Sequence, residues 1–206
     1  VIRHHKEFNM STLTVQNIQG SSSSGNTISV ASGHVIHQPG SVIQTVSNSN
    51  GTAFTTTSTS YVNLISVSIT PKFSNSKILI TGTMFVTHRD YYDGRIKLVF
   101  DSGSGNTDIT LGSAKAEYMV RENGHPSQNF STSNWGETCA LYSAVPYVLN
   151  FDHSPNTTSA VSYIVQGLTG HNSQTFYFNR GSTSATDILH ISTIIAQEIA
   201  QWVGQK

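Results

Sequence analysis

The sequence predicts an all-β protein in which two antiparallel sheets pack face to face. Apolar and polar residues alternate with period two over several stretches rich in β-branched residues, as in half-buried strands. Serine and threonine make up roughly a quarter of the 206 residues, which suits strands and turns better than long helices. Turn-forming clusters recur roughly every 8–15 residues, and no segment shows a convincing amphipathic helical pattern.

The clearest pattern lies in residues 61–86. Residues 61–69 alternate between two faces, which predicts a half-buried strand. Pro71 and the polar residues 72–76 predict a turn, and residues 77–86 predict a second, longer strand. Together the two strands predict a long β-hairpin around which the rest of the chain is organised.

We expect residues 1–40 to form an N-terminal attachment or stalk segment. Residues 1–9 precede Met10, and the run MSTLTVQNIQG looks like a natural start, so we interpret residues 1–9 as an upstream addition or an alternative start. Short β-patterned pieces occur over residues 13–46, and each is too short to bury its apolar face alone. Association of copies in the stalk of a trimeric fibre would bury these faces; a flexible linker is the alternative.

We expect residues 41–206 to form the head domain. The last predicted strand is apolar on both of its faces, which suits a central position in a sheet. With the hairpin the chain has about ten predicted strands, which favours an antiparallel two-sheet sandwich of the jelly-roll kind. After the hairpin, the predicted strands are residues 95–100, 107–111, 116–120, 138–149 (broken by Pro146), 160–168, 175–178 and 187–199.

Long loops in compact domains often carry function, and the longest turn-rich region, residues 121–134, is the best candidate for one. Residues 47–51 and 88–94 also predict loops. Residues 101–106 predict the turn of a hairpin that joins the strands at 95–100 and 107–111.

Composition excludes several kinds of partner. The chain has 11 basic and 11 acidic residues, so no net charge draws it to nucleic acid or to an anionic membrane. Cys139 is the only cysteine, so no internal disulfide is possible. No apolar run reaches the ~18 residues of a membrane span, and the first residues lack the apolar core of a signal peptide. We therefore expect export by another route, such as cell lysis.

Enzyme signatures are absent, and we expect no catalytic site, cofactor or metal. His34 and His37 have ligand-like spacing, but an odd offset on a strand sends the two side chains to opposite faces. A site where copies meet on a trimer axis stays open. Residues 101–108 carry carboxylates at calcium-like intervals but lack the closing glutamate of an EF-hand, so the hairpin turn is favoured.

Five aromatic or imidazole side chains in predicted loops are candidates for receptor binding. Such groups can stack on sugar rings or fill a partner's pocket, although ordinary core or loop packing is the alternative for each of them. They are Tyr91, Tyr92, His125, Trp135 and His153.

The runs SVIQTV, STSYVNLISVSITPKFSNSKILI and TSATDILHISTIIAQEI, with the MSTL start at Met10, resemble tail-fibre-like and other virion fibre proteins of marine bacteriophages, including those of cyanobacteria. The resemblance touches both ends of residues 40–199. It implies a virion structural protein, without enzymatic chemistry, that has a jelly-roll head on a trimeric stalk.

Three functions follow from this resemblance and the patterns above. The first is a homotrimeric tail or neck fibre on the virion, attached to other virion proteins by its N-terminal segment and binding a host-surface glycan or protein. The second is a purely structural capsid decoration or head fibre without a receptor. The third is a secreted trimeric jelly-roll ligand, against which the missing signal peptide argues.

Overall fold

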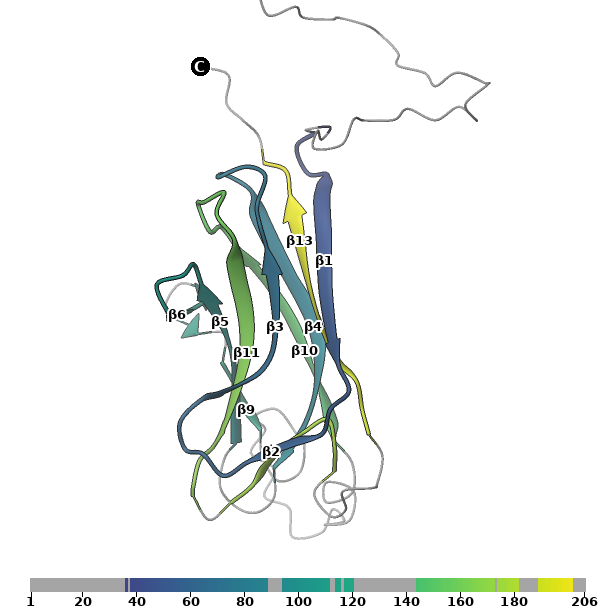
Figure 1. The fold of residues 1–206 in the computed structure, drawn as a ribbon, viewed down its shortest axis with the longest axis vertical. Helices are drawn as coiled ribbons and strands as arrows, with labels where there is room; N and C mark the ends of the chain where they lie inside the picture. The colour runs from purple at the N-terminus through teal and green to yellow at the C-terminus, as the bar shows by residue number, and fades with distance from the viewer. Residues whose placement is uncertain are drawn as a thin grey trace, which may run out of the picture. The chain divides into compact units, whose positions relative to one another are not determined.

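Two antiparallel sheets pack face to face in the computed structural model, which describes residues 36, 38–88, 94–111, 114–115, 117–120, 144–172, 174–181 and 189–201 (Figure 1). Every described strand belongs to one compact unit, His37–Lys206. The described residues include no helix. None of them therefore forms a helix long and apolar enough to cross a membrane. The prediction of an all-β, two-sheet sandwich is confirmed.

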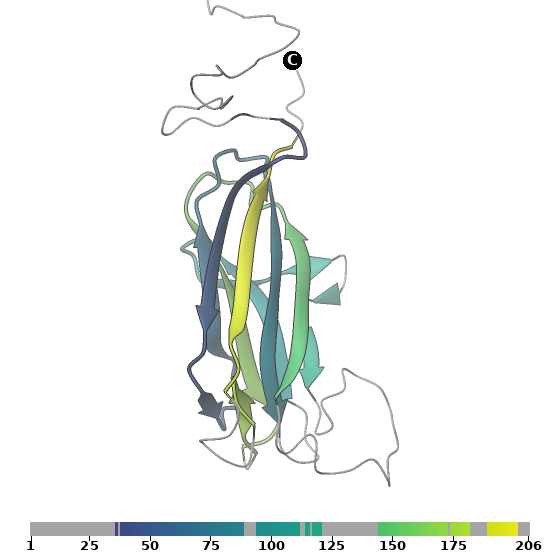
Figure 2. The ribbon, with the colours of Figure 1, turned by 90° about the vertical axis from the view of Figure 1, so that its right-hand side faces the viewer.

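The first sheet has six strands, and its long strands lie in the order β1-β13-β4-β10 (Figure 2). Past the point where β13 begins at Ser192, the short strand β12 pairs with β4, and β2 pairs with β12. The bounds are β1 Val42–Asn50, β2 Phe54–Thr56, β4 Lys77–His88, β10 Val145–His153, β12 Phe176–Phe178 and β13 Ser192–Ile199.

The second sheet has five strands, in the order β3-β11-β5, with β6 and β9 both pairing with β5. A separate short pair joins β7 and β8. This strand order is consistent with a jelly roll, in which chain segments alternate between two four-stranded layers. The bounds are β3 Val62–Ile69, β5 Gly94–Asp101, β6 Asn106–Asp108, β7 Thr110–Leu111, β8 Ala114–Lys115, β9 Glu117–Val120 and β11 Val161–Thr169.

The prediction that residues 61–86 form one long hairpin is wrong. Strands form at both predicted places, but β3 pairs with β11 in the second sheet, while β4 pairs with β13, β10 and β12 in the first. The turn between them therefore crosses from one sheet to the other. Alternation tells which side chains are buried, and it does not tell which strand is the neighbour.

The predicted alternation of β3 also breaks at one point. Val165 pairs with Ile65 while the next residue, Gln166, pairs with Asn63, so Leu64 is an extra residue in a β-bulge. Both Leu64 and Ile65 are consequently buried. The bulge lets β3 keep apolar side chains in the core on both sides of the irregularity.

The first strand differs from its prediction as well. Residues 42–46 were grouped with the stalk pieces and residues 47–51 with a loop, yet β1 runs without interruption from Val42 to Asn50. It pairs with β13 along its length, so this segment finds its partner within the same chain.

Three other predictions are confirmed. β5 and β6 form the predicted hairpin, in which Asp101 Oδ1 accepts hydrogen bonds from Gly103 N at 2.7 Å and Gly105 N at 3.1 Å. Both glycines have positive φ, which favours glycine there. β9 forms within the predicted strand 116–120 and pairs with β5, and β13 lies between β1 and β4 as a central strand.

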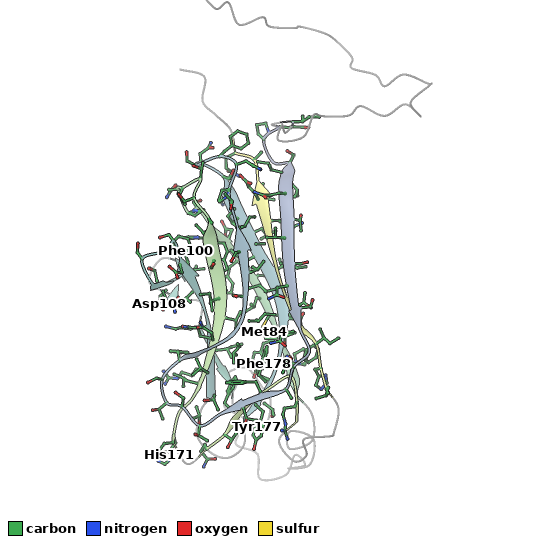
Figure 3. The ribbon with its side chains drawn as sticks, in the orientation of Figure 1. Met84, Phe100, Asp108, His171, Tyr177 and Phe178 are labelled. Carbon is green, nitrogen blue, oxygen red and sulfur yellow. The ribbon has the colours of Figure 1, made fainter. Side chains whose placement is uncertain are left out.

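Apolar side chains fill the space between the sheets. Met84 of β4 and Phe178 of β12 are fully buried there (Figure 3). The core cluster contains Leu64, Ile65, Val67, Ile69, Ile78, Ile80, Met84, Val86, Ile96, Leu98, Ile109, Tyr147, Leu149, Phe151, Val161, Tyr163, Val165, Phe176, Phe178, Ile194 and Ala196. This interior has the composition of a structural core, with bulky aliphatic and aromatic groups and few polar atoms.

Glu198 is a fully buried carboxylate that ties the β3–β4 turn to the first sheet. Its Oε1 accepts hydrogen bonds from Lys72 N at 2.8 Å, Phe73 N at 3.2 Å and Ser76 Oγ at 2.6 Å, and its Oε2 accepts one from Gln44 Nε2 at 2.6 Å. Burial acts to raise the pKa of Glu198, but these four hydrogen bonds outweigh it and hold the pKa below its usual value.

Asn179 joins the end of β1 at Asn50, the start of β13 at Ser192 and β4 at Phe85 through hydrogen bonds. Its side-chain amide donates to Asn50 O at 2.7 Å and Thr52 O at 3.2 Å, and its Oδ1 accepts from Ser192 Oγ at 2.5 Å. Its backbone N donates to Phe85 O at 2.8 Å. The residue is buried with φ of 60°, a conformation that asparagine adopts more readily than most residues.

Candidate interaction surfaces

The sandwich has two ends of different character. We call the end where β1 begins at Val42 and β13 ends at Ile199 the proximal end, because the chain enters and leaves the sandwich there. Gly40 N donates to Ala200 O at 2.8 Å at this end. The distal end is the opposite one, where β4 ends at His88 and β5 begins at Gly94.

The residues that flank the long connections gather at the distal end. Gly94 pairs with Val120 on one side and with Thr169 on the other, so the end of β9 meets the start of β5 there. The start of β10 at Val145 pairs with Val86, close to the end of β4. His171, in the turn after β11, marks this end in Figure 3. The connections 89–93 and 121–143 therefore both start and finish at the distal end.

Four of the five predicted receptor-binding residues belong to these two connections. Tyr91 and Tyr92 lie within 89–93, and His125 and Trp135 lie within 121–143, so all four are outside the described residues. The fold brings the attachment points of both connections to one end of the sandwich, although they are far apart in sequence.

His153 lies at the proximal end, at the last position of β10, where it pairs with Ile78. Its ring is half-buried against Phe100, with ring centroids 4.6 Å apart, and its Nδ1 lies 3.1 Å from the hydroxyl of Tyr163. Burial lowers the pKa of His153, and the neighbouring Asp152 carboxylate opposes this only in part. The structure thus places His153 at the end opposite the one where the connections 89–93 and 121–143 start and finish.

The four long strands of the first sheet present an exposed face to the outside, which we call the outer face (Figure 2). Side chains from β1, β13, β4 and β10 form rows across it. From the row of Val148 toward the proximal end, successive rows are Ser49, Thr193, Thr83 and Val148; then Ser47, Ile195, Thr81 and Asn150; then Thr45, Gln197, Leu79 and Asp152; then Val42, Ile199 and Lys77.

Large apolar side chains stand exposed on this face. Val148 is 66% exposed and Val42 is 51% exposed, and Ile191 and Leu189, just before β13, are 63% and 60% exposed. The charged groups of the face, Lys77 and Asp152, form an ion pair of 2.6 Å near its proximal end. The row of Val148 and the row of Asn150, which we call the central rows, carry no charge.

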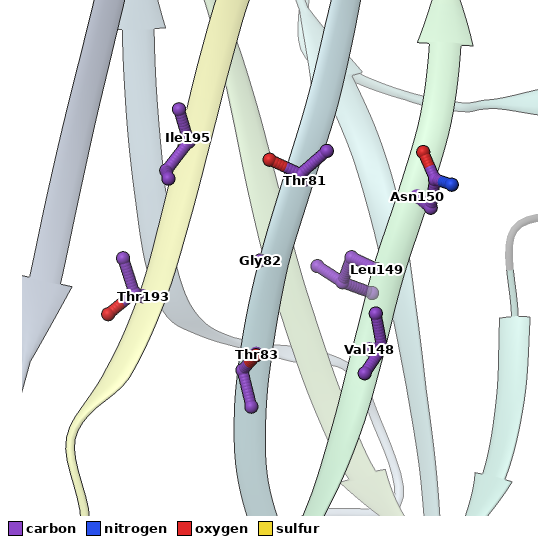
Figure 4. A pocket seen from close by; sticks show the side chains of 8 residues that line it. All are labelled: Thr81, Gly82, Thr83, Val148, Leu149, Asn150, Thr193 and Ile195. Atoms are coloured by element: carbon purple, nitrogen blue, oxygen red, sulfur yellow. The ribbon is translucent and has the colours of Figure 1, made fainter.

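A shallow hollow of about 430 Å³ lies in these central rows. Figure 4 shows the short side chains of Thr81 and Thr83 on β4, with Ile195 on β13 to one side and Val148 on β10 to the other. The hollow exists because β4 carries small side chains between two strands that carry larger ones. It offers apolar walls and a few hydroxyl groups, with no acid, base or nucleophile pair among its lining residues.

The outside of the second sheet is polar by comparison. Ser68 and Ser162 share a hydrogen bond of 2.8 Å there, and Gln166 Nε2 donates to Asn63 Oδ1 at 2.8 Å. Lys97 forms an ion pair of 2.8 Å with Asp108. These polar groups bond to one another, and Ile164 and Val99 in the row between them are buried, as is Gln166.

Within the described parts of the chain, no group of three or more His, Cys, Asp or Glu residues is placed to hold a metal ion. His34 and His37 both fall outside those parts, so the possibility of a shared site on a trimer axis stays a prediction.

Neither a protein-family model nor a curated protein matches the chain. Among solved structures, the chain is similar to the protein in the crystal structure of the infectious bursal disease virus VP2 subviral particle, at 12% sequence identity and a TM-score of 0.34. The match covers 84% of this chain and 42% of that one, so the chain spans less than half the length of the structure that it matches. A likeness this distant carries no conclusion about function.

The outer face was missed at the level of sequence, although a signal for it is present. The predicted strand at residues 187–199 carries apolar side chains on both faces, which predicts a central position in the sheet. In the structure, Ile194 and Ala196 point into the core, whereas Ile195 and Ile199 point outward. A strand that is apolar on both sides predicts that something covers both sides.

Proposed function

We propose that the protein is a bacteriophage virion structural protein, a tail or neck fibre that projects from the particle and takes part in attachment to the host surface. In this proposal it is a homotrimer, residues 1–40 attach it to other virion proteins, and residues 41–206 form the head. The resemblance of its sequence runs to phage fibre proteins supports the virion assignment.

The observation that carries the proposal is the polarity of the sandwich. The chain enters and leaves at the proximal end, whereas the connections 89–93 and 121–143 start and finish at the distal end. A head held by its proximal end would present the distal end outward. Binding residues are commonly placed on loops that a rigid scaffold positions in this way.

The chemistry of the distal connections suits a glycan. Tyr91, Tyr92 and Trp135 can stack on sugar rings, while neighbouring asparagine and aspartate side chains bond to sugar hydroxyls. Such sites are shallow and bind weakly one at a time. Three copies on one fibre would raise the avidity by roughly 10²–10⁴, which is why a trimer suits this role.

The test is labelling of susceptible host cells with fluorescent full-length protein. The double variant Trp135→Ala with Tyr92→Ala should label at least tenfold more weakly and keep its melting temperature. Asn75→Ala, an exposed change in the proximal β3–β4 turn, is the matched control and should label like the wild type. His153→Ala should also leave labelling unchanged, because His153 lies at the proximal end.

The contrary result is equally clear. If the wild-type protein binds no susceptible host while particles that lack it adsorb normally, host attachment is wrong. The protein would then be a purely structural part of the virion, such as a capsid decoration or head fibre.

A further inference from the structure

We propose that the outer face of β1, β13, β4 and β10 is the surface through which copies of this chain pack against one another, with the hollow over β4 receiving side chains from the neighbouring copy. This inference rests on the homotrimer of the proposed function and adds the location of its interface.

The first argument is the double-faced strand β13. Its inward residues Ile194 and Ala196 are fully buried, as the core requires. Its outward residues Ile195 and Ile199 remain partly exposed, and Ile191 just ahead of them is 63% exposed. Exposed apolar side chains on a sheet face are commonly buried against a partner when subunits assemble.

The second argument is electrostatic. An interface buries charges only at a large cost unless they are paired. The charged residues of the four strands' outward rows, Lys77 and Asp152, are already paired at 2.6 Å near the proximal end. Packing two copies together over the central rows would therefore leave no unpaired charge from these rows, and their threonine hydroxyls can bond across the contact.

The third argument is size. The four strands contain 9, 8, 12 and 9 residues. Four strands about 4.8 Å apart, with about eight residues each at about 3.3 Å, present roughly 500 Å². In a ring of three copies each copy would bury this whole face, half of it against each neighbour, so each contact buries roughly 500 Å² and the three contacts together about 1,500 Å². The outside of the second sheet is a poorer choice because its polar groups bond to one another.

In a ring of three copies, a contact joins two different parts of the surface. The β1 and β13 side of one outer face would meet the β4 and β10 side of the next, so the apolar groups of one side face the hollow beside Val148. Association of the same face about a two-fold axis would instead give a dimer.

The test is the mass of the full-length protein in solution at micromolar concentration, measured by light scattering. The wild type should have the mass of three 22.3 kDa chains, and Val148→Lys should have the mass of one. Ser66→Lys, on an exposed position of β3 in the second sheet, is the control and should stay trimeric. Circular dichroism should show the same β-sheet spectrum for all three proteins.

A second measurement avoids inserting a charge. In a Cys139→Ser background, Val148→Cys should react with a maleimide at least tenfold more slowly in the assembled protein than after dilution to monomer. Ser66→Cys should react at the same rate in both states. Slow labelling of Val148→Cys only when the chains are assembled would support the interface directly.

The outcomes separate the inference from the function on which it rests. A wild-type trimer that stays trimeric in Val148→Lys, with Val148→Cys fully reactive, overturns the interface and keeps the trimer. A wild-type dimer that Val148→Lys dissociates supports the face and overturns the trimer. A wild-type monomer overturns both, and host attachment is then judged by the cell-labelling experiment alone.

Discussion

Glu198 stabilises the proximal end because its buried carboxylate accepts hydrogen bonds from two separate parts of the chain. The β3–β4 turn donates through two backbone N–H groups and Ser76, and β1 donates through Gln44. A buried donor that loses its acceptor costs about 1–3 kcal/mol. The carboxylate therefore gives acceptors to the partly buried N–H groups of Lys72 and Phe73 and to the buried hydroxyl of Ser76.

We expect Glu198→Gln to lower the free energy of unfolding at pH 7 by about 2–3 kcal/mol. The glutamine side chain has the same size, but whichever way its amide is turned, one of its N–H groups faces a donor. Urea denaturation measures the change. Asp152→Asn is the control: it breaks the exposed ion pair with Lys77 and should cost less than about 1 kcal/mol.

The stabilisation by Glu198 should depend on pH in a defined direction. The hydrogen bonds hold the pKa of Glu198 below its usual value of 4.5. The contribution is therefore fully present above pH 4.5 and is lost as the pH falls through the lower, folded-state pKa. The stability difference between wild type and Glu198→Gln should be constant from pH 7 to about pH 5 and shrink below pH 4.5. A difference that persists undiminished to pH 2 would contradict this.

At the distal end, Asn179 combines a backbone conformation with three side-chain hydrogen bonds. Two substitutions separate these contributions. Asn179→Gly keeps the positive φ and loses the hydrogen bonds, which should cost about 2 kcal/mol. Asn179→Ala loses both and should cost about 1 kcal/mol more, because alanine disfavours positive φ. Equal melting temperatures for the two variants would show that the backbone conformation contributes nothing.

At the scale of elements, β1 closes one edge of the sandwich through its side chains. Gln44, Asn48 and Asn50 donate to the carbonyl oxygens of Thr70, Ser66 and Leu64 along β3, at 2.7, 2.8 and 3.4 Å. β1 and β3 are the edge strands of different sheets, and their free edges would otherwise be open to other chains. The amide side chains thus cover the unpaired carbonyls of β3.

We expect Asn48→Ala to lower the free energy of unfolding by about 1 kcal/mol, since it removes one hydrogen bond at an exposed position. Ser47→Ala, on the neighbouring position that points to the outer face, should change it by less than about 0.5 kcal/mol. Thermal unfolding of both variants measures the effect. Equal losses would mean that the amide–carbonyl contacts do not stabilise this edge.

The same edge shows what the sequence could and could not predict. Period-two alternation located β3 and β13 because burial alternates along both strands, and the Asp101 turn located the β5–β6 hairpin because its residues interact locally. Pairing partners were not predictable, since β3 and β4 are neighbours in sequence yet belong to opposite sheets. β1 was missed over residues 47–50 because its inward residues Asn48 and Asn50 are polar, and their acceptors lie on a strand that is distant in sequence.

At the scale of the whole molecule, the sandwich separates three tasks among its surfaces. The proximal end receives the chain, the distal end carries the flanks of the long connections, and the outer face of the first sheet is the proposed contact between copies. Residue type predicts the candidates Tyr91, Tyr92, His125 and Trp135, and these stay predictions. Residue type alone does not show that His153 lies at the proximal end, because the direction of β10 is not visible in the sequence.

This division predicts the behaviour of a fragment that begins at Gly40. All described strands lie between Val42 and Ile199, and Glu198 and Asn179 find their described partners within the same range. The fragment should therefore fold with a β-sheet circular dichroism spectrum and a melting temperature within about 3 °C of the full chain. If residues 1–40 attach the protein to the particle, the fragment should label host cells and compete with particle adsorption, yet be absent from purified particles. A fragment that is incorporated as well as the full chain would contradict the assignment of attachment to residues 1–40.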